Sequence, residues 1–147
     1  MMENRVNINQ TEPLAFKAMY ALENYLASGQ LSKSLRELIK IRTSQINSCA
    51  YCIDMHTKDA LKNGETNQRI FLLSAWRETD LFTEEERAVL AMTEEITLIN
   101  QGGLSETTYQ NSLAFFNENQ IAQIIMAIVT INGWNRIAIS TGMQIGS

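Results

Sequence analysis

The sequence contains little proline and glycine: one proline and seven glycines among 147 residues. A fold built from many short strands needs more of both at its turns, so a β-rich architecture is not expected. No stretch of the chain is dominated by charge of one sign. The formal net charge is −4, and no stripe of lysine and arginine could neutralise phosphates, which argues against a nucleic-acid-binding surface.

Long hydrophobic runs are also missing. The first thirteen residues contain no apolar segment of the kind found in a secretory signal. The longest nearly apolar stretch, Ile121–Ile131, is too short to cross a bilayer and is interpreted as a buried helix. We therefore expect a cytoplasmic protein with no membrane partner. Because that compartment keeps thiols reduced, a close pair of cysteines there is typical of redox or metal chemistry rather than of a permanent structural disulfide.

Apolar residues recur at helical spacing along the chain, and no alternation typical of strands stands out. The pattern predicts an all-α fold, a single domain over residues 1–147 with about seven helices, and residues 1–10 loosely held. The expected helices cover about 11–27, 34–47, 48–63, 66–78, 83–100, 105–116 and 119–139. A capping box of Thr83 with Glu86 is expected to open the fifth of them, and Ser105 is expected to start the sixth.

Two of these helices have informative faces. The first is expected to bury an apolar face formed by Leu14, Ala18, Ala21, Leu22 and Tyr25. The last, capped by Asn119, is apolar on nearly all sides, so it lies either at the centre of the core or against another subunit.

Both cysteines and the only histidine fall within eight residues, at Cys49, Cys52 and His56. On a helix, Cys52 lies roughly 60° and His56 roughly 20° from Cys49, so all three share one face. With Asn47 or Ser48 as the N-cap, the cysteines occupy the first turn, where free N–H groups and the helix dipole favour a thiolate.

Three interpretations of this cluster remain open. Cys49 and Cys52 could cycle between dithiol and disulfide, with His56 moving a proton. The three residues could bind zinc, although a carboxylate would have to supply the fourth ligand. Alternatively, the cysteines are small buried apolar residues and His56 is a satisfied polar one.

The segment LRELIKIRTSQINSCAYCIDMH contains Glu37, Cys49, Cys52 and His56 in the pattern Glu-x11-Cys-x2-Cys-x3-His. This spacing resembles the signature of the AhpD-like alkylhydroperoxidases, within the carboxymuconolactone decarboxylase superfamily. The resemblance covers most of the chain and is sharp over residues 35–64.

The resemblance implies an AhpD-like helical bundle, assembled as a homo-oligomer (commonly a trimer or hexamer), that uses no metal and no cofactor. It implies a peroxidase-like oxidoreductase in which Cys52 attacks a small hydroperoxide and Cys49 resolves the product to a disulfide. Glu37 and His56 would relay protons through water. A lipoyl group or a thioredoxin-like dithiol protein would then reduce the disulfide.

Several points remain open within this resemblance. Tyr51 stands where the best-known peroxidases of the family have a second histidine, which favours a general disulfide reductase as the alternative activity. A non-catalytic helical oligomeric binding module is another alternative. Decarboxylase activity is not expected, because the decarboxylase branch of the family lacks the cysteine pair.

The roles of individual residues are open as well. Proximity to the helix start favours Cys49 as the nucleophile, and pairing with His56 favours Cys52. Glu37 could also merely close a capping box with Ser34.

Overall fold

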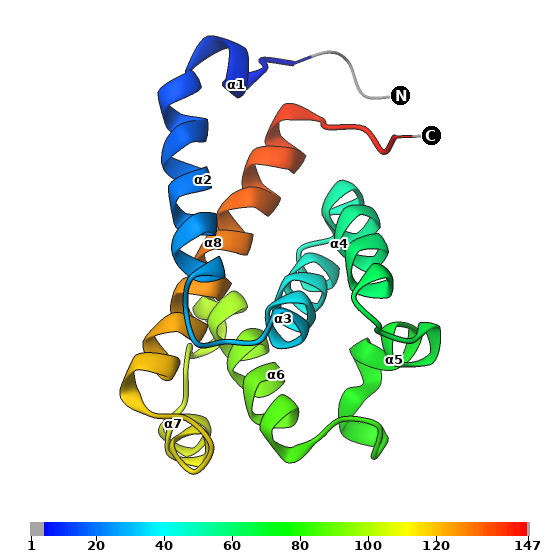
Figure 1. Cartoon of the computed structure of the whole chain (residues 1–147), viewed down its shortest axis with the longest axis vertical. Coiled ribbons are helices and arrows are strands. Elements are labelled where there is room, and N and C mark those ends of the chain that lie inside the picture. Colours follow the sequence, from blue (N-terminus) through cyan, green and yellow to red (C-terminus); the bar gives the residue numbers. More distant parts are fainter. Residues whose placement is uncertain (1–4, 147) are drawn as a thin grey trace.

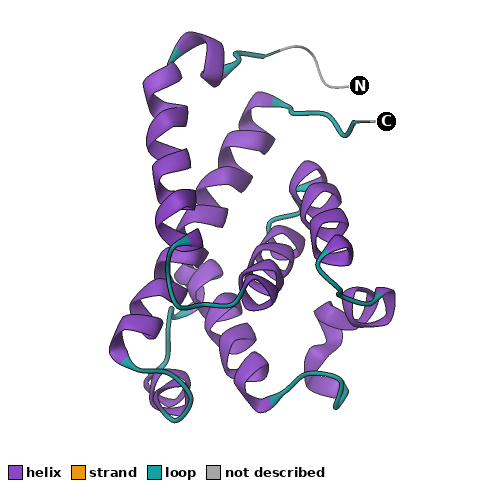
Figure 2. Cartoon of the chain, in the orientation of Figure 1, coloured by secondary structure: helices purple, strands orange, loops and turns teal. Residues whose placement is uncertain are grey.

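The computed structural model describes residues 5–146, and within this range every regular element is a helix (Figures 1 and 2). The expected all-α fold is confirmed. The elements are α1 (Ile8–Thr11), α2 (Pro13–Ala27), α3 (Lys33–Ile46), α4 (Ala50–Lys62), α5 (Asn67–Leu72), η1 (Leu73–Glu78), α6 (Glu84–Thr97), η2 (Ile99–Gln101), α7 (Glu106–Leu113) and α8 (Glu118–Thr141).

The described part of the chain therefore has more helices than the seven expected, for two local reasons. Asn7 caps a short N-terminal turn by accepting a hydrogen bond from Gln10 N at 3.0 Å, so residues 8–10 are helical rather than loosely held. Pro13 lacks an N–H and starts a new helix, α2. The expected helix over 66–78 divides into α5 and the 3₁₀ helix η1, and within η1 Ala75 leaves helical geometry. Residues 1–4 lie outside the described range.

Capping side chains set the other boundaries. The predicted capping box of Thr83 with Glu86 is present at the start of α6, and Ser105 caps α7 as expected. The predicted cap of the last helix at Asn119 is wrong. Asn117 caps α8, because Gln120 stands three residues after it and its side-chain oxygen accepts a hydrogen bond from the Asn117 backbone N–H at 3.0 Å.

The core is built around α3, which packs against α4, α6 and α8. One apolar cluster joins α3, α6 and α8 through residues such as Ile39, Met92 and Ile128. A second fills the space between α3, α6 and the α5–η1 segment, and includes Leu38 and Trp76. Helices α3 and α4, which carry Glu37 and the cysteine motif, are therefore each packed against more than one other helix.

The inward face predicted for α2 is wrong. Leu14 is 76% exposed and Tyr25 43% exposed, and Ala18 and Ala21 are exposed too, whereas Leu22 is half-buried. The helix runs beside α8 (Figure 1) and instead turns Leu26 and Met19 toward it. Because α2 has apolar residues on two faces, periodicity alone could not choose between them.

Helix α8 spans 24 residues, well beyond the apolar run that the sequence showed. By length and composition it could cross a membrane, a test that core helices of soluble proteins also pass. It packs against five other helices, α2, α3, α4, α6 and α7. Ile121, Ile124, Ile128 and Ile131 are buried, as expected of a central helix, whereas Val129 is 48% exposed.

Candidate functional site

The turn between α3 and α4 places the cysteine motif. Helix α3 ends with Ser48 in the left-handed region at φ 57°. The N–H of Cys49 donates to Ser44 O at 2.9 Å, and that of Ser48 donates to Gln45 O at 3.2 Å. These two bonds form a Schellman motif, which normally uses glycine where Ser48 stands. The end of α3 therefore fixes the backbone of Cys49 with no intervening loop.

Cys49 is itself the N-cap of α4, so the expected caps Asn47 and Ser48 are wrong. Its sulfur accepts a hydrogen bond from the N–H of Cys52 at 3.4 Å. The structure pairs Cys49 with Cys52 as a disulfide whose Cα atoms are 5.3 Å apart. Both residues are almost fully buried. Each sulfur therefore lies in the first turn of α4, where helix N–H groups stabilise negative charge.

A buried amide network holds this turn against α8. The side chain of Asn47 donates to Asn132 and Asn135 at 2.9 Å each. Asn135, which is 0% exposed, donates to the hydroxyl of Ser44 at 3.0 Å. Because Ser44 also accepts the hydrogen bond from Cys49 N, this network positions the first residue of the cysteine pair.

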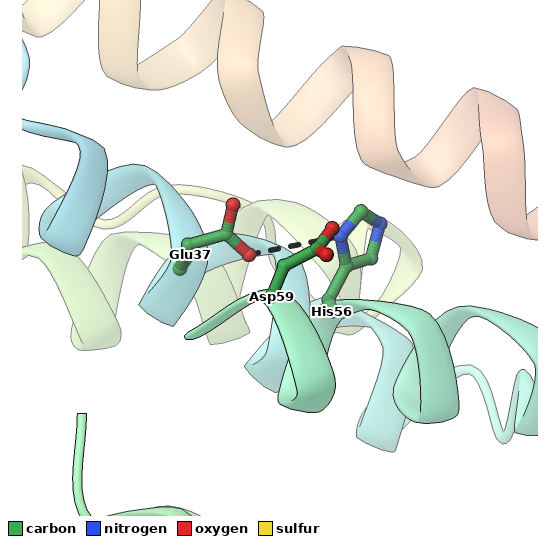
Figure 3. Close-up of side chains that lie close together, drawn as sticks. All are labelled: Glu37, His56 and Asp59. Atoms are coloured by element: carbon green, nitrogen blue, oxygen red, sulfur yellow. Dashed lines mark ion pairs between the residues drawn. The ribbon is translucent and has the colours of Figure 1, made fainter. Parts of the chain in front are cut away.

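Glu37 reaches His56 from the preceding helix, as the four-residue spacing predicted (Figure 3). Glu37 Oε2 and His56 Nδ1 lie 3.7 Å apart, beyond hydrogen-bond distance, and neither atom has a hydrogen-bond partner among the described residues. The alternative that Glu37 closes a capping box with Ser34 is wrong. Helix α3 begins two residues earlier than that box requires, and Ser32 caps it by accepting from Leu35 N.

Burial shifts the proton affinities of this pair. Glu37 is 5% exposed and His56 is 7% exposed. Desolvation raises the pKa of Glu37 above its ordinary value, against the opposing effect of the Lys40 charge. Desolvation, with the Lys40 charge acting in the same direction, lowers the pKa of His56 to about 4. The imidazole is therefore neutral near pH 7 and free to accept a proton.

Asp59 lies beside this pair and was not singled out from the sequence (Figure 3). Glu37, His56 and Asp59 each offer a metal-ligating atom, all within 4.8 Å of one another. The Lys40 ammonium, however, is 3.8 Å from Glu37 Oε1, and its charge repels a metal cation. The zinc interpretation of Cys49, Cys52 and His56 also fits poorly, because the two sulfurs are bonded to each other.

A cavity of about 320 Å³ opens onto Cys52 and His56, and we call it the Cys52 cavity. Three aromatic side chains from α2 and α8 pack against one another in its wall, with Trp134 centred 5.4 Å from Phe16 and 5.6 Å from Tyr20. Its full lining is Phe16, Tyr20, Glu23, Lys40, Tyr51, Cys52, Met55, His56, Trp134, Ala138 and Met143.

Polar groups in and beside this cavity form a chain of contacts across three helices, α8, α2 and α3. Trp134 Nε1 donates to Glu23 at 3.1 Å, and Lys40 Nζ lies 3.5 Å from Glu23 and 3.8 Å from Glu37. Sequence reasoning missed Glu23 and Lys40, because nothing in their local sequence distinguishes them from solvated charges. An apolar pocket that presents a cysteine and a neutral imidazole, with the buried Glu37 carboxyl 3.7 Å from that imidazole, suits proton-coupled sulfur chemistry.

The chain is similar in sequence to known proteins. The sequence profile of the carboxymuconolactone decarboxylase family matches residues 13–95. The chain is 42% identical to the uncharacterized protein YdfG of Bacillus subtilis, over 99% of both chains.

Solved structures are similar as well. One is a protein of unknown function from Agrobacterium tumefaciens, named provisionally as the antioxidant defence protein AhpD. It superimposes with a TM-score of 0.94 at 41% identity, over 99% of both chains. An uncharacterized peroxidase-related protein from Silicibacter sp. TM1040 follows with a TM-score of 0.79 and 27% identity, over 89% of this chain and 70% of that one. The chain therefore belongs to the carboxymuconolactone decarboxylase family, as an AhpD-like member.

Proposed function

We propose that the protein is a thiol-dependent peroxidase that reduces small hydroperoxides through a Cys49–Cys52 dithiol/disulfide cycle in the cytoplasm. The observation that carries the proposal is the placement of Glu37. It comes from a different helix, is buried without a hydrogen-bond partner, and lies 3.7 Å from the imidazole that shares a cavity with Cys52. A buried carboxyl without a partner is costly to fold and is typical of a functional site.

In the proposed reaction, His56 accepts the proton of the Cys52 thiol, directly or through water, and Glu37 exchanges protons with His56. The Cys52 thiolate attacks one peroxide oxygen and the O–O bond breaks. The alcohol leaves with a proton from the relay, and Cys52 becomes a sulfenic acid. Cys49 then attacks the Cys52 sulfur, water leaves, and the disulfide forms. An external dithiol, a lipoyl group or a thioredoxin-like protein, restores both thiols.

The nucleophile is assigned to Cys52 rather than Cys49. Cys49, as the N-cap, has the closer helix N–H group, which would support its ionisation. Only Cys52, however, shares a cavity with His56 and therefore has a general base available where a peroxide would bind.

Single-cysteine variants test this assignment, because the chain has two cysteines and no others. After reduction and treatment with cumene hydroperoxide, wild type should form the Cys49–Cys52 disulfide. Cys49→Ser should stop at a sulfenic acid on Cys52 that reacts with dimedone, and Cys52→Ser, the matched control, should remain unlabelled. Failure of wild type to form the disulfide would discard the mechanism.

Tyr51 supports a second candidate activity, general disulfide reduction. It lines the Cys52 cavity at the point where a second base would assist peroxide cleavage, and its phenol is a poor base near neutral pH. If this activity dominates, reduced protein will exchange with a small disulfide such as oxidised dithiothreitol much faster than it reacts with peroxide. Two unreactive thiols would instead favour a non-catalytic binding module.

We also propose that the chain assembles with copies of itself through the exposed stripe of α2. Leu14, Ala18, Ala21 and Tyr25 form an apolar face that the single chain leaves uncovered. Exposed faces of this kind mark association sites. Leu14→Glu should reduce the mass measured by light scattering, whereas Lys17→Glu, exposed on the same helix outside the stripe, should not. An unchanged mass in Leu14→Glu would exclude this face.

A further inference from the structure

A second cavity, of about 420 Å³, opens onto Cys49, the other residue of the cysteine pair. We call it the Cys49 cavity. It is lined by Ser48, Cys49, Ala50, Ile139, Gln144 and Ile145, together with Tyr51, Ala138 and Met143, which it shares with the Cys52 cavity. The cysteine pair therefore lies between two cavities: the Cys52 cavity opens onto Cys52, and the Cys49 cavity opens onto Cys49.

The two cavities differ in chemistry. The Cys52 cavity contains the imidazole of His56 and the charged groups of Lys40 and Glu23. The Cys49 cavity has no charged side chain among its described lining residues, and its lining includes the half-exposed Ile139 and Ile145. Peroxide cleavage needs a proton for the departing oxygen, whereas attack by a thiolate on a disulfide needs only access to a sulfur.

We propose that the reducing dithiol enters through the Cys49 cavity and attacks the Cys49 sulfur, while the hydroperoxide enters through the Cys52 cavity. This inference rests on the proposed peroxidase cycle. The incoming thiolate forms a bond to Cys49 Sγ, the Cys49–Cys52 bond breaks, and its electron pair leaves on Cys52 as a thiolate. The second thiol of the reductant then attacks its own sulfur bound to Cys49. Cys49 is released as a thiol, and the reductant leaves as a disulfide.

This direction of attack leaves Cys52 ready for the next peroxide. The released thiolate lies in the first turn of α4, where the helix N-terminus stabilises it, and it faces the cavity that contains His56. The burial of Cys49, at 1% exposure, selects the kind of reductant. A flat protein surface cannot reach its sulfur, whereas a slender dithiol on a hydrocarbon arm fits a cavity lined by apolar side chains such as Ile139 and Ile145.

Two matched variants on α4 test the two routes. Ala50→Phe narrows the Cys49 cavity and Met55→Trp narrows the Cys52 cavity, and both positions are exposed. Stopped-flow single turnovers would give the rate of oxidation by cumene hydroperoxide and the rate of reduction by dihydrolipoamide. The ratio of reduction to oxidation should fall at least about tenfold in Ala50→Phe and rise by a similar factor in Met55→Trp. Changes of the ratio in the same direction, or no change, would overturn the inference.

A measurement on the wild-type chain keeps the inference testable if either variant misfolds. Oxidised protein is mixed briefly with 2-mercaptoethanol, quenched in acid and alkylated with N-ethylmaleimide, and the adducts are located by peptide fragmentation between residues 49 and 52. We expect mercaptoethanol on Cys49 and maleimide on Cys52. The reverse labelling would overturn this inference and leave the peroxidase cycle intact, whereas a protein that peroxide never converts to the disulfide would remove the proposed function itself.

Discussion

Two carboxylates on neighbouring helices are held in opposite ways. Glu94 on α6 accepts hydrogen bonds from Arg42 at 2.8 Å, from Trp76 at 3.2 Å, and from Arg77. Glu37 on α3 is more deeply buried, and its Oε2 has no hydrogen-bond partner among the described residues. The Lys40 ammonium is 3.8 Å from Glu37 Oε1, and the unprotonated imidazole of His56 is 3.7 Å from Glu37 Oε2.

The difference appears in their proton affinities. Burial acts to raise the pKa of Glu94, but the hydrogen bonds from Arg77 and Arg42 outweigh it and hold that pKa below its usual range. At Glu37 burial prevails and the pKa is raised. A carboxylate with a complete set of donors stabilises a fold, whereas one left without donors binds a proton more tightly than usual. We infer that Glu94 is structural and that Glu37 is available for chemistry.

Glu37→Gln should give the largest effect on reactivity. The amide keeps the shape of the side chain but cannot exchange a proton, so the second-order rate of Cys52 oxidation by cumene hydroperoxide should fall about 100-fold. Stopped-flow measurement on reduced protein at pH 7 would show it. Glu94→Gln is the matched control and should react within about threefold of wild type. Equal rates in Glu37→Gln and wild type would remove Glu37 from the proposed relay.

Glu94→Gln should give the largest effect on stability, because three donors lose their charged acceptor. We expect the free energy of unfolding at pH 7 to fall by about 2–3 kcal/mol in urea denaturation. Since the folded-state pKa of Glu94 is depressed, its contribution is present above the unfolded-state pKa of about 4.3 and is lost as pH falls below it. The difference between variant and wild type should therefore shrink toward pH 3. A larger loss in Glu37→Gln than in Glu94→Gln would reverse the comparison.

Because His56 is the only histidine in the chain, its titration directly reports the protonation of the buried Glu37–His56 pair. Its imidazole resonance in the proton NMR spectrum should titrate with a pKa of about 4. Between pH 6.5 and 4 the unfolded chain binds a proton that the folded chain does not, so His56 makes the protein less stable as pH falls through this window. Lys40→Met should raise this pKa, because the ammonium repels the imidazolium.

The control for that titration is Lys58→Met, which removes an exposed lysine from the same helix as His56. Because water screens its charge, it should leave the imidazole titration nearly unchanged. A midpoint near 6.5 in wild type would mean that the imidazole is solvated rather than buried.

Much of this arrangement follows from the sequence, because helix signals are local. The capping box of Thr83 with Glu86 and the cap at Ser105 depend on residues three positions apart and were predicted correctly. The approach of Glu37 to His56 came from the spacing of the four-residue motif and its resemblance to a family. The roles of Glu37, Cys49, Cys52 and His56 remain predictions.

What the sequence could not provide depends on contacts between distant residues. Lys40 and Glu23 become part of the cavity only because α2 and α3 meet there, and Asn135 matters only because α8 passes the turn at Asn47. The start of α4 was misplaced because Ser48 adopts the left-handed conformation without being glycine. The hydrogen bonds that the N–H groups of Ser48 and Cys49 donate to the end of α3 impose this conformation, rather than any preference of serine for it.

The smallest expected effect distinguishes the two serines at the start of α3. Ser32 accepts the hydrogen bond from Leu35 N at 3.1 Å, whereas Ser34 lies inside the helix and is exposed. Ser32→Ala should therefore lower the free energy of unfolding by about 1 kcal/mol, and Ser34→Ala, the matched control, should change it by less than about 0.5 kcal/mol. If Ser34→Ala were the more destabilising, Glu37 would be bonded to the backbone at Ser34. It would then be a satisfied carboxylate like Glu94, with no proton to contribute to His56.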